Sequence, residues 1–105
     1  MRRAGLGAGR ATTLQEILDA VCAEAGVSRD ALLGPRRAYG EARRLACYLM
    51  AEICLDKSLP TIGRFLELDR VTVVYHRKRA RRMLCDDPEF RDLFERVARR
   101  LEIRP

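Results

Sequence analysis

The sequence predicts an all-α protein of about six helices, and three observations support this fold class. Apolar residues recur with the period of about 3.6 residues that an amphipathic helix requires, in one segment after another of the 105-residue chain. Residues that cap or stop helices stand between these segments. No stretch shows the alternation of apolar and polar residues that is typical of a strand.

The chain is expected to have two parts. Residues 1–11 are small, glycine-rich and basic, so we expect them to form a disordered arm. Residues 12–105 carry all of the periodic segments. We expect them to fold as a single helical domain, because a chain of this length has room for one core.

The first two helices are predicted from their caps. Thr13 and Glu16 have the spacing of a capping box and open the first helix. Gly26 closes it, as glycine commonly does just beyond a helix end. Ser28 caps a short second helix, which ends at Gly34.

The middle of the chain contains a basic loop and a third helix. Residues 34–40 include the adjacent arginines Arg36 and Arg37 and no acidic residue. From Glu41 to about Leu55 the apolar residues again follow the helical period, so we expect a helix there.

The fourth and fifth helices lie close together in the sequence. Ser58 and Pro60 form a helix start, with serine as the cap and proline in the first turn, and predict a helix over 59–66. Asp69 caps a longer helix over 70–85. Two helices joined by so short a turn are typical of a helix-turn-helix motif. A sixth amphipathic helix completes the chain.

The positive charge is concentrated in the middle of the chain. The formal net charge is +6, from 21 basic and 15 acidic side chains. Residues 36–82 carry twelve basic and five acidic side chains, a net charge of +7, whereas both ends are close to neutral. Nineteen of the 21 basic residues are arginine, the side chain suited to forked contacts with phosphate and guanine. We therefore expect a polyanionic partner.

The second helix of the motif carries much of this charge. In a helix-turn-helix protein this helix presents its N-terminal residues to the major groove. Here these are Arg70, Val71 and Thr72, with Tyr75 as a further candidate. Further along, five cations occupy six positions with no acid between them: Arg77, Lys78, Arg79, Arg81 and Arg82. Because these cations would repel one another without a polyanion, they predict contact with DNA phosphates.

Four runs of residues occur in a characteristic order. They are ALLGPRR (31–37), ARRLACYL (42–49), SLPTIG (58–63) and DRVTV (69–73). They resemble the runs DLLSKRR, ARQIAMYL, SLPEIG and DHTTV of the C-terminal DNA-binding domain of the bacterial replication initiator DnaA. The resemblance covers about residues 13–104.

The resemblance implies two modes of DNA contact. An arginine of the basic loop would enter the minor groove; either Arg36 or Arg37 matches it, and we prefer Arg37. The start of the recognition helix would contact bases in the major groove, and the start of the preceding helix would touch thymine methyls or the backbone. With the phosphate contacts, the predicted DNA-binding residues are Arg36, Arg37, Leu59, Pro60, Asp69, Arg70, Val71, Thr72, Arg77, Lys78 and Arg81.

The sequence departs from the family pattern inside the recognition motif. Arg70 stands where histidine is usual, which favours a guanine partner, and Val71 replaces the first threonine, which favours a methyl contact. We therefore expect an altered or relaxed site preference. A register shifted by one residue would align His76 with a family histidine but would place Arg81 on the buried stripe.

Other functional classes lack the residues that they need. The four cysteines are too far apart for paired zinc ligands, and one histidine cannot complete a zinc finger, so we expect no metal. No phosphate-binding loop or nucleophile–base pair is evident, so we expect no enzyme activity, no cofactor and no small-molecule substrate. No apolar run approaches the roughly 18 residues that cross a membrane.

We therefore expect a stand-alone module that binds double-stranded DNA in the cytoplasm, in association with the nucleoid. It would regulate replication initiation or transcription, with the replication initiator or other replication proteins as further partners. The alternative is a protein-interaction adaptor on the same fold, with little sequence-specific DNA binding, that uses Tyr39 and the final helix.

Overall fold

The computed structural model describes residues 7–8, 12–34 and 40–104. In these residues it contains six helices and two short strands, which confirms the predicted all-α class. The helices are α1 (Leu14–Ala25), α2 (Arg29–Leu33), α3 (Gly40–Ile53), α4 (Leu59–Leu66), α5 (Arg70–Asp86) and α6 (Pro88–Leu101). Each predicted helix is present.

The predicted caps form as local hydrogen bonds. The Thr13 hydroxyl accepts from the Glu16 backbone N–H at 3.1 Å, and the Glu16 carboxylate accepts from the Thr13 N–H at 3.0 Å. This is the complete capping box. Gly26 ends α1 in the left-handed conformation, with φ 71°. Ser28 and Ser58 cap α2 and α4 through their hydroxyl groups.

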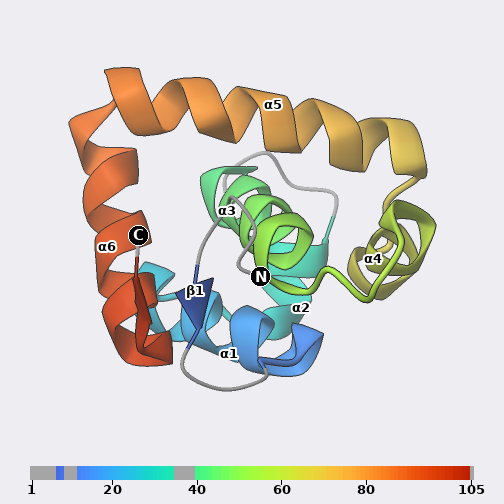
Figure 1. Cartoon of the computed structure of the whole chain (residues 1–105), viewed down its shortest axis with the longest axis horizontal. Coiled ribbons are helices and arrows are strands. Elements are labelled where there is room, and N and C mark those ends of the chain that lie inside the picture. Colours follow the sequence, from blue (N-terminus) through green and yellow to red (C-terminus); the bar gives the residue numbers. More distant parts are fainter. Residues whose placement is uncertain (1–6, 9–11, 35–39, 105) are drawn as a thin grey trace.

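α3 lies at the centre of the molecule, and the other helices surround it (Figure 1). α5 runs along one edge above α3, with α4 at its N-terminal end and α6 at its C-terminal end, whereas α1 and α2 lie on the opposite side of α3 (Figure 1). Every helix contributes to one core. Fully buried side chains from the six helices include Ile17, Leu32, Leu49, Ile62, Val73 and Phe90. Each such side chain stabilises the fold by about 1.5–3 kcal/mol relative to exposure.

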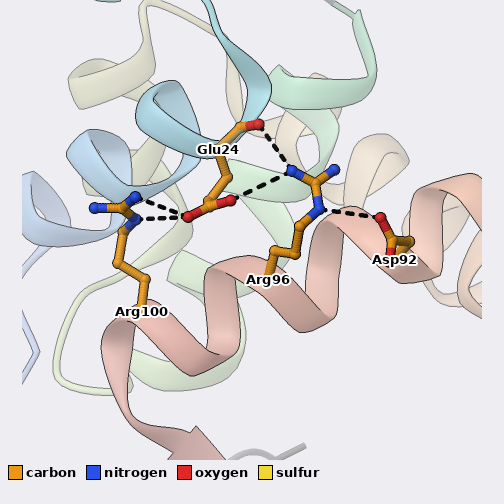
Figure 2. A network of polar contacts seen from close by, with 4 residues as sticks. All are labelled: Glu24, Asp92, Arg96 and Arg100. Atoms are coloured by element: carbon orange, nitrogen blue, oxygen red, sulfur yellow. Dashed lines mark hydrogen bonds and ion pairs between the residues drawn. The ribbon is translucent and has the colours of Figure 1, made fainter.

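A network of charged side chains joins α1 to α6 (Figure 2). The Glu24 carboxylate accepts from Arg100 at 2.8 Å and from Arg96 at 3.3 Å. Arg96 also donates to the Glu24 carbonyl at 3.1 Å and to Asp92 at 3.0 Å. The hydrogen bond from Arg100 is the main reason that the pKa of Glu24 lies below its ordinary value. The arginines of α6 are thus used to hold the two helices together.

The structure also contains a short ladder that the sequence did not indicate. β1 (Gly7–Ala8) pairs antiparallel with β2 (Ile103–Arg104). A strand of two residues is too short to show an alternating pattern. β1 lies inside the predicted basic arm, residues 1–11, and the rest of that arm lies outside the described residues.

Candidate nucleic-acid interface

α4 and α5 form the predicted helix-turn-helix, joined by residues 67–69. Glu67 ends α4 in the left-handed conformation, with φ 61°. The Leu68 N–H then donates to the Gly63 carbonyl at 2.7 Å, which closes the end of α4. Asp69 begins α5, because its carboxylate accepts from the backbone N–H of Thr72 at 2.7 Å.

Gly63 allows the turn to lie directly against α4. A Cβ atom at this position would lie 2.5 Å from the Leu68 carbonyl oxygen and 3.4 Å from a methyl group of Val73. The oxygen belongs to the backbone, so it cannot move aside as a flexible side chain would. Only glycine fits here without a shift of the turn, and the angle between α4 and α5 depends on it.

The hydrogen bond at the start of α5 occupies the Asp69 carboxylate. Hydrogen bonds from the Thr72 side chain and then from its backbone N–H hold the pKa of Asp69 below its ordinary value. Asp69 therefore has a structural role as the cap, in addition to the base contact predicted for it.

One side of α5 packs on the core along a narrow seam. The buried residues of this seam are Val73, Ala80 and Met83. Ala80 is fully buried, whereas Arg81 is exposed. This agrees with the alignment in which Arg70 stands at the usual histidine position, since the alignment shifted by one residue would place Arg81 on the buried stripe.

Arg44 of α3 borders the seam on one flank. Its Nε donates to His76 Nδ1 at 3.2 Å, and its guanidinium lies 5.8 Å from the centre of the Tyr75 ring. Burial, followed by the charges of Arg44 and Arg43, lowers the pKa of His76 to about 4. The imidazole is therefore neutral near pH 7 and can accept the hydrogen bond from Arg44.

Glu52 of α3 borders the seam on the other flank. It is the one polar or charged residue that is buried among the described residues. Its Oε2 atom accepts from Arg77 at 3.0 Å and from Arg81 at 2.9 Å. The sequence predicts that repulsion among the cations of α5 destabilises the helix unless a polyanion is bound. That is wrong for Arg77 and Arg81, because an acid 25 and 29 residues away in the sequence folds against them.

The opposite side of α5 faces outward along the edge of the molecule (Figure 1). Residues spaced by three or four lie on one helix face, and those of the outermost stripe are Val71, Tyr75, Lys78 and Arg82. Val71 is 76% exposed and Tyr75 is 56% exposed. Within the described part of the chain, none of the exposed cations Arg70, Lys78, Arg79 and Arg82 has an ion-pair partner. The exposed side of the helix thus carries uncompensated positive charge.

The structure distributes the predicted DNA-binding residues unevenly. Arg70, Val71 and Lys78 are exposed on α5, and Pro60 is exposed in the first turn of α4. Leu59 and Thr72 are partly buried, Asp69 caps α5, and Arg77 and Arg81 are paired with Glu52. Tyr75, Arg79 and Arg82 are exposed on α5 as well. The sequence pattern names Arg79 and Arg82 among the phosphate-contacting cations, although they are not in the list of predicted DNA-binding residues given above.

The predicted basic loop falls mostly outside the described residues, and Arg36 and Arg37 are among those outside. Its start is held by Arg43 of α3. The Arg43 Nε donates to the Leu32 carbonyl at 2.9 Å, and the same guanidinium donates to the Gly34 carbonyl.

Residues 7–8, 12–34 and 40–104 contain no group of three or more histidine, cysteine, aspartate or glutamate residues placed to hold a metal ion. No helix in these ranges has both the length and the apolar character needed to cross a membrane. The four cysteines are free thiols.

The sequence of the chain is similar to known proteins. A family model described as the bacterial DnaA protein helix-turn-helix matches residues 14–80, from α1 through most of α5. The chromosomal replication initiator protein DnaA of Synechococcus sp. (strain JA-2-3B'a(2-13)) is 32% identical over 94 residues. That similarity covers 87% of this chain but 20% of the Synechococcus protein. The chain therefore spans about a fifth of the length of this relative.

Proposed function

The chain belongs to the bacterial DnaA helix-turn-helix family, and on that basis we propose that it binds double-stranded DNA through α5. The observation that carries the proposal is the outward face of α5, where Arg70, Lys78, Arg79 and Arg82 are exposed and lack ion-pair partners in the described residues. Exposed cations that lack an ion-pair partner are typical of a surface that binds a polyanion such as DNA.

The N-terminal turn of α5 is proposed to read bases in the major groove. Arg70 would donate to guanine O6 and N7, and Val71 would contact a thymine methyl group. Asp69 and Thr72 would lie beside them, and Leu59 and Pro60 at the start of α4 would contact the DNA from the adjoining helix. Through these contacts the protein would recognise a DNA sequence related to, but different from, the sequences bound by family members that have histidine in place of Arg70.

The rest of the interface is proposed to hold the phosphate backbone. Lys78, Arg79 and Arg82 would make phosphate contacts that carry no base information. Arg77 and Arg81 would contribute to the same positive field, although Glu52 neutralises part of their charge. Arg36 or Arg37 of the basic loop would enter the minor groove.

In the cell, we propose that the protein acts on chromosomal DNA without catalysing a reaction. By occupying sites of the initiator type it would compete with, or assist, a replication initiator, or control transcription near those sites. The replication initiator and other replication proteins are the candidate protein partners. Cytoplasmic, nucleoid-associated localisation follows from such a role.

A titration against labelled duplex DNA tests the proposal. If six to nine phosphates are neutralised, the logarithm of the binding constant falls with the logarithm of salt concentration with a slope of about −5 to −8. Absence of binding at low salt, or a flat salt response, would overturn the proposal. Either result would favour the protein-interaction adaptor.

Selection of bound duplexes from a random pool defines the site. We expect an enriched sequence that contains guanine at the position facing Arg70. Equal binding of the enriched sequence and its scrambled version at physiological salt would contradict the base-reading role while leaving DNA binding intact.

A further inference from the structure

Among the residues that the structure describes, Glu52 is the one whose charged side chain is buried. Its side chain is 11% exposed, whereas the side chains of its partners Arg77 and Arg81 are 31% and 56% exposed. Both guanidinium groups donate to the same oxygen atom. A buried carboxylate depends on such partners, because an unpaired charge in the interior costs several kcal/mol.

α3 makes polar contacts on both sides of the α5 seam. Glu52 makes those on one side, and Arg44 makes those on the other. Arg77 and Arg81 lie on one flank of Ala80 and meet Glu52. His76 and Met83 lie on the other flank, and Arg44 contacts both, at 3.2 Å and 3.3 Å. Because the buried seam is narrow, contacts on both flanks are what stop α5 from rotating about its axis. That rotation decides which side chains face outward.

The pairing with Glu52 also determines how much of the positive charge of Arg77 and Arg81 is available to DNA phosphates. A phosphate group and the Glu52 carboxylate compete for the same guanidinium donors. Glu52 lies on α3 within the core and cannot follow the arginines outward. Transfer of Arg77 or Arg81 to a phosphate would therefore leave a buried carboxylate short of compensation, which opposes the transfer.

We propose that Glu52 is a positioning residue that holds Arg77 and Arg81 on the protein and so limits the part of DNA binding that is independent of sequence. The binding free energy then depends more on the base-reading turn at Arg70 and less on the phosphate backbone. This inference rests on the proposed DNA binding by α5, and it adds a determinant of specificity that does not touch DNA.

Two neighbouring arginines provide the first test. Arg82→Gln removes an exposed cation that has no ion-pair partner, whereas Arg81→Gln removes a cation that Glu52 already holds. Arg77 keeps its 3.0 Å contact with Glu52 in the second variant, so we expect both variants to fold. We expect Arg82→Gln to weaken binding to any duplex about fivefold at physiological salt, with a salt slope shallower by about 0.9. Arg81→Gln should weaken it less than about twofold. Equal effects of the two substitutions, whether large or small, would overturn the inference.

Removal of the carboxylate provides the second test. Glu52→Gln should release one or both arginines to phosphates. For each arginine released, we expect a random duplex to bind about fivefold more tightly and the salt slope to steepen by about 0.9. Asp92→Asn is the matched control, because it also removes one negative charge and one arginine ion pair, but on α6. Equal affinity and slope in these two variants would overturn the inference.

Discrimination is measured with the same proteins. The ratio of affinities for the selected sequence and its scrambled version should fall in Glu52→Gln and stay unchanged in Asp92→Asn. A loss of folding would weaken binding, which is opposite in sign to the expected change, and thermal unfolding identifies it. If Glu52→Gln unfolds, the comparison of Arg81→Gln with Arg82→Gln decides. If the unaltered protein shows no salt-dependent binding to duplex DNA, the proposed function itself fails, before any variant is compared.

Discussion

α5 and α6 are both rich in arginine, but they use it in opposite ways. α5 contains six basic residues and one acid, and α6 contains four arginines and three acids. On α6, Arg96 and Arg100 bind Glu24 of α1, and Arg91 donates to the carbonyl groups of Leu84 and Cys85 at the end of α5. On α5, only Arg77 and Arg81 have a carboxylate partner among the described residues.

The difference shows that charge alone does not identify an interface. α6 has six buried residues on a broad apolar face, and Arg96 and Arg100 lie where they reach Glu24 of the neighbouring α1. α5 has three buried residues, so most of its circumference remains free. The same side chain stabilises the scaffold in one helix and is available to a polyanion in the other.

Gly63→Ala is expected to have the largest effect, because it acts where the two helices of the motif meet. The added methyl group would lie 2.5 Å from the Leu68 carbonyl oxygen. We expect the free energy of unfolding, measured by urea titration, to fall by about 3 kcal/mol, the upper range for overpacking. The same substitution at Gly40, where no atom beyond its chain neighbours and its own helix backbone lies within 4 Å of the new Cβ, is the control and should change stability little. Equal stability of the two variants would contradict the account of the turn.

Arg70→Ala tests base reading at the start of α5. We expect a loss of about 1–3 kcal/mol in binding free energy on the selected sequence and a smaller loss on a scrambled one. Arg99→Ala, which removes an exposed arginine of α6, is the control and should leave both affinities unchanged. If Arg70→Ala weakens both sequences equally, Arg70 contacts phosphate and does not read bases.

The starts of four helices, α1, α2, α4 and α5, were predictable from the sequence. Thr13, Ser28, Ser58 and Asp69 cap their helices through hydrogen bonds to residues three positions away. Such bonds depend on the identity of near neighbours, so the sequence contains the signal directly.

The tertiary pairing of charges was not predictable in the same way. Glu52 and Arg81 are 29 residues apart, and Glu24 and Arg100 are 76 residues apart. Their contact depends on how α3 lies under α5 and how α1 lies beside α6, which no local pattern specifies. For this reason the sequence alone assigns all the cations of α5 to DNA and does not separate Arg77 and Arg81, which bind Glu52, from the cations that stay unpaired in the described residues.

Glu24→Gln tests the scaffold side of the comparison. The substitution weakens the contacts with Arg96 and Arg100 that join α1 to α6, so we expect a lower midpoint of thermal unfolding. DNA affinity should match that of Glu95→Gln, which removes the same charge from an exposed position of α6. A change in affinity that Glu95→Gln does not share would show that the α1–α6 network also controls the DNA-binding face.

His76 is expected to affect how stability depends on pH. Its pKa is about 4 in the folded protein, against an ordinary value of 6.5, because of burial and the charges of Arg44 and Arg43. The unfolded chain therefore binds more protons between these values, so stability declines as the pH is lowered from 6.5 to 4. Urea unfolding at about pH 7 and about pH 5 should show this decline. His76→Gln should reduce it, and an unchanged decline in that variant would assign it to other groups.

The contrast between α5 and α6 is tested most directly by removing the same charge from each helix. One variant changes Lys78, Arg79 and Arg82 of α5 to glutamine, and the other changes Arg91, Arg99 and Arg100 of α6. In titrations of duplex DNA over about 50–300 mM salt, we expect the α5 variant to have a slope shallower by about 2.7, and the α6 variant to keep the slope of the unaltered protein. Equal slopes in the two variants would contradict the claim that α5 is the DNA-binding face.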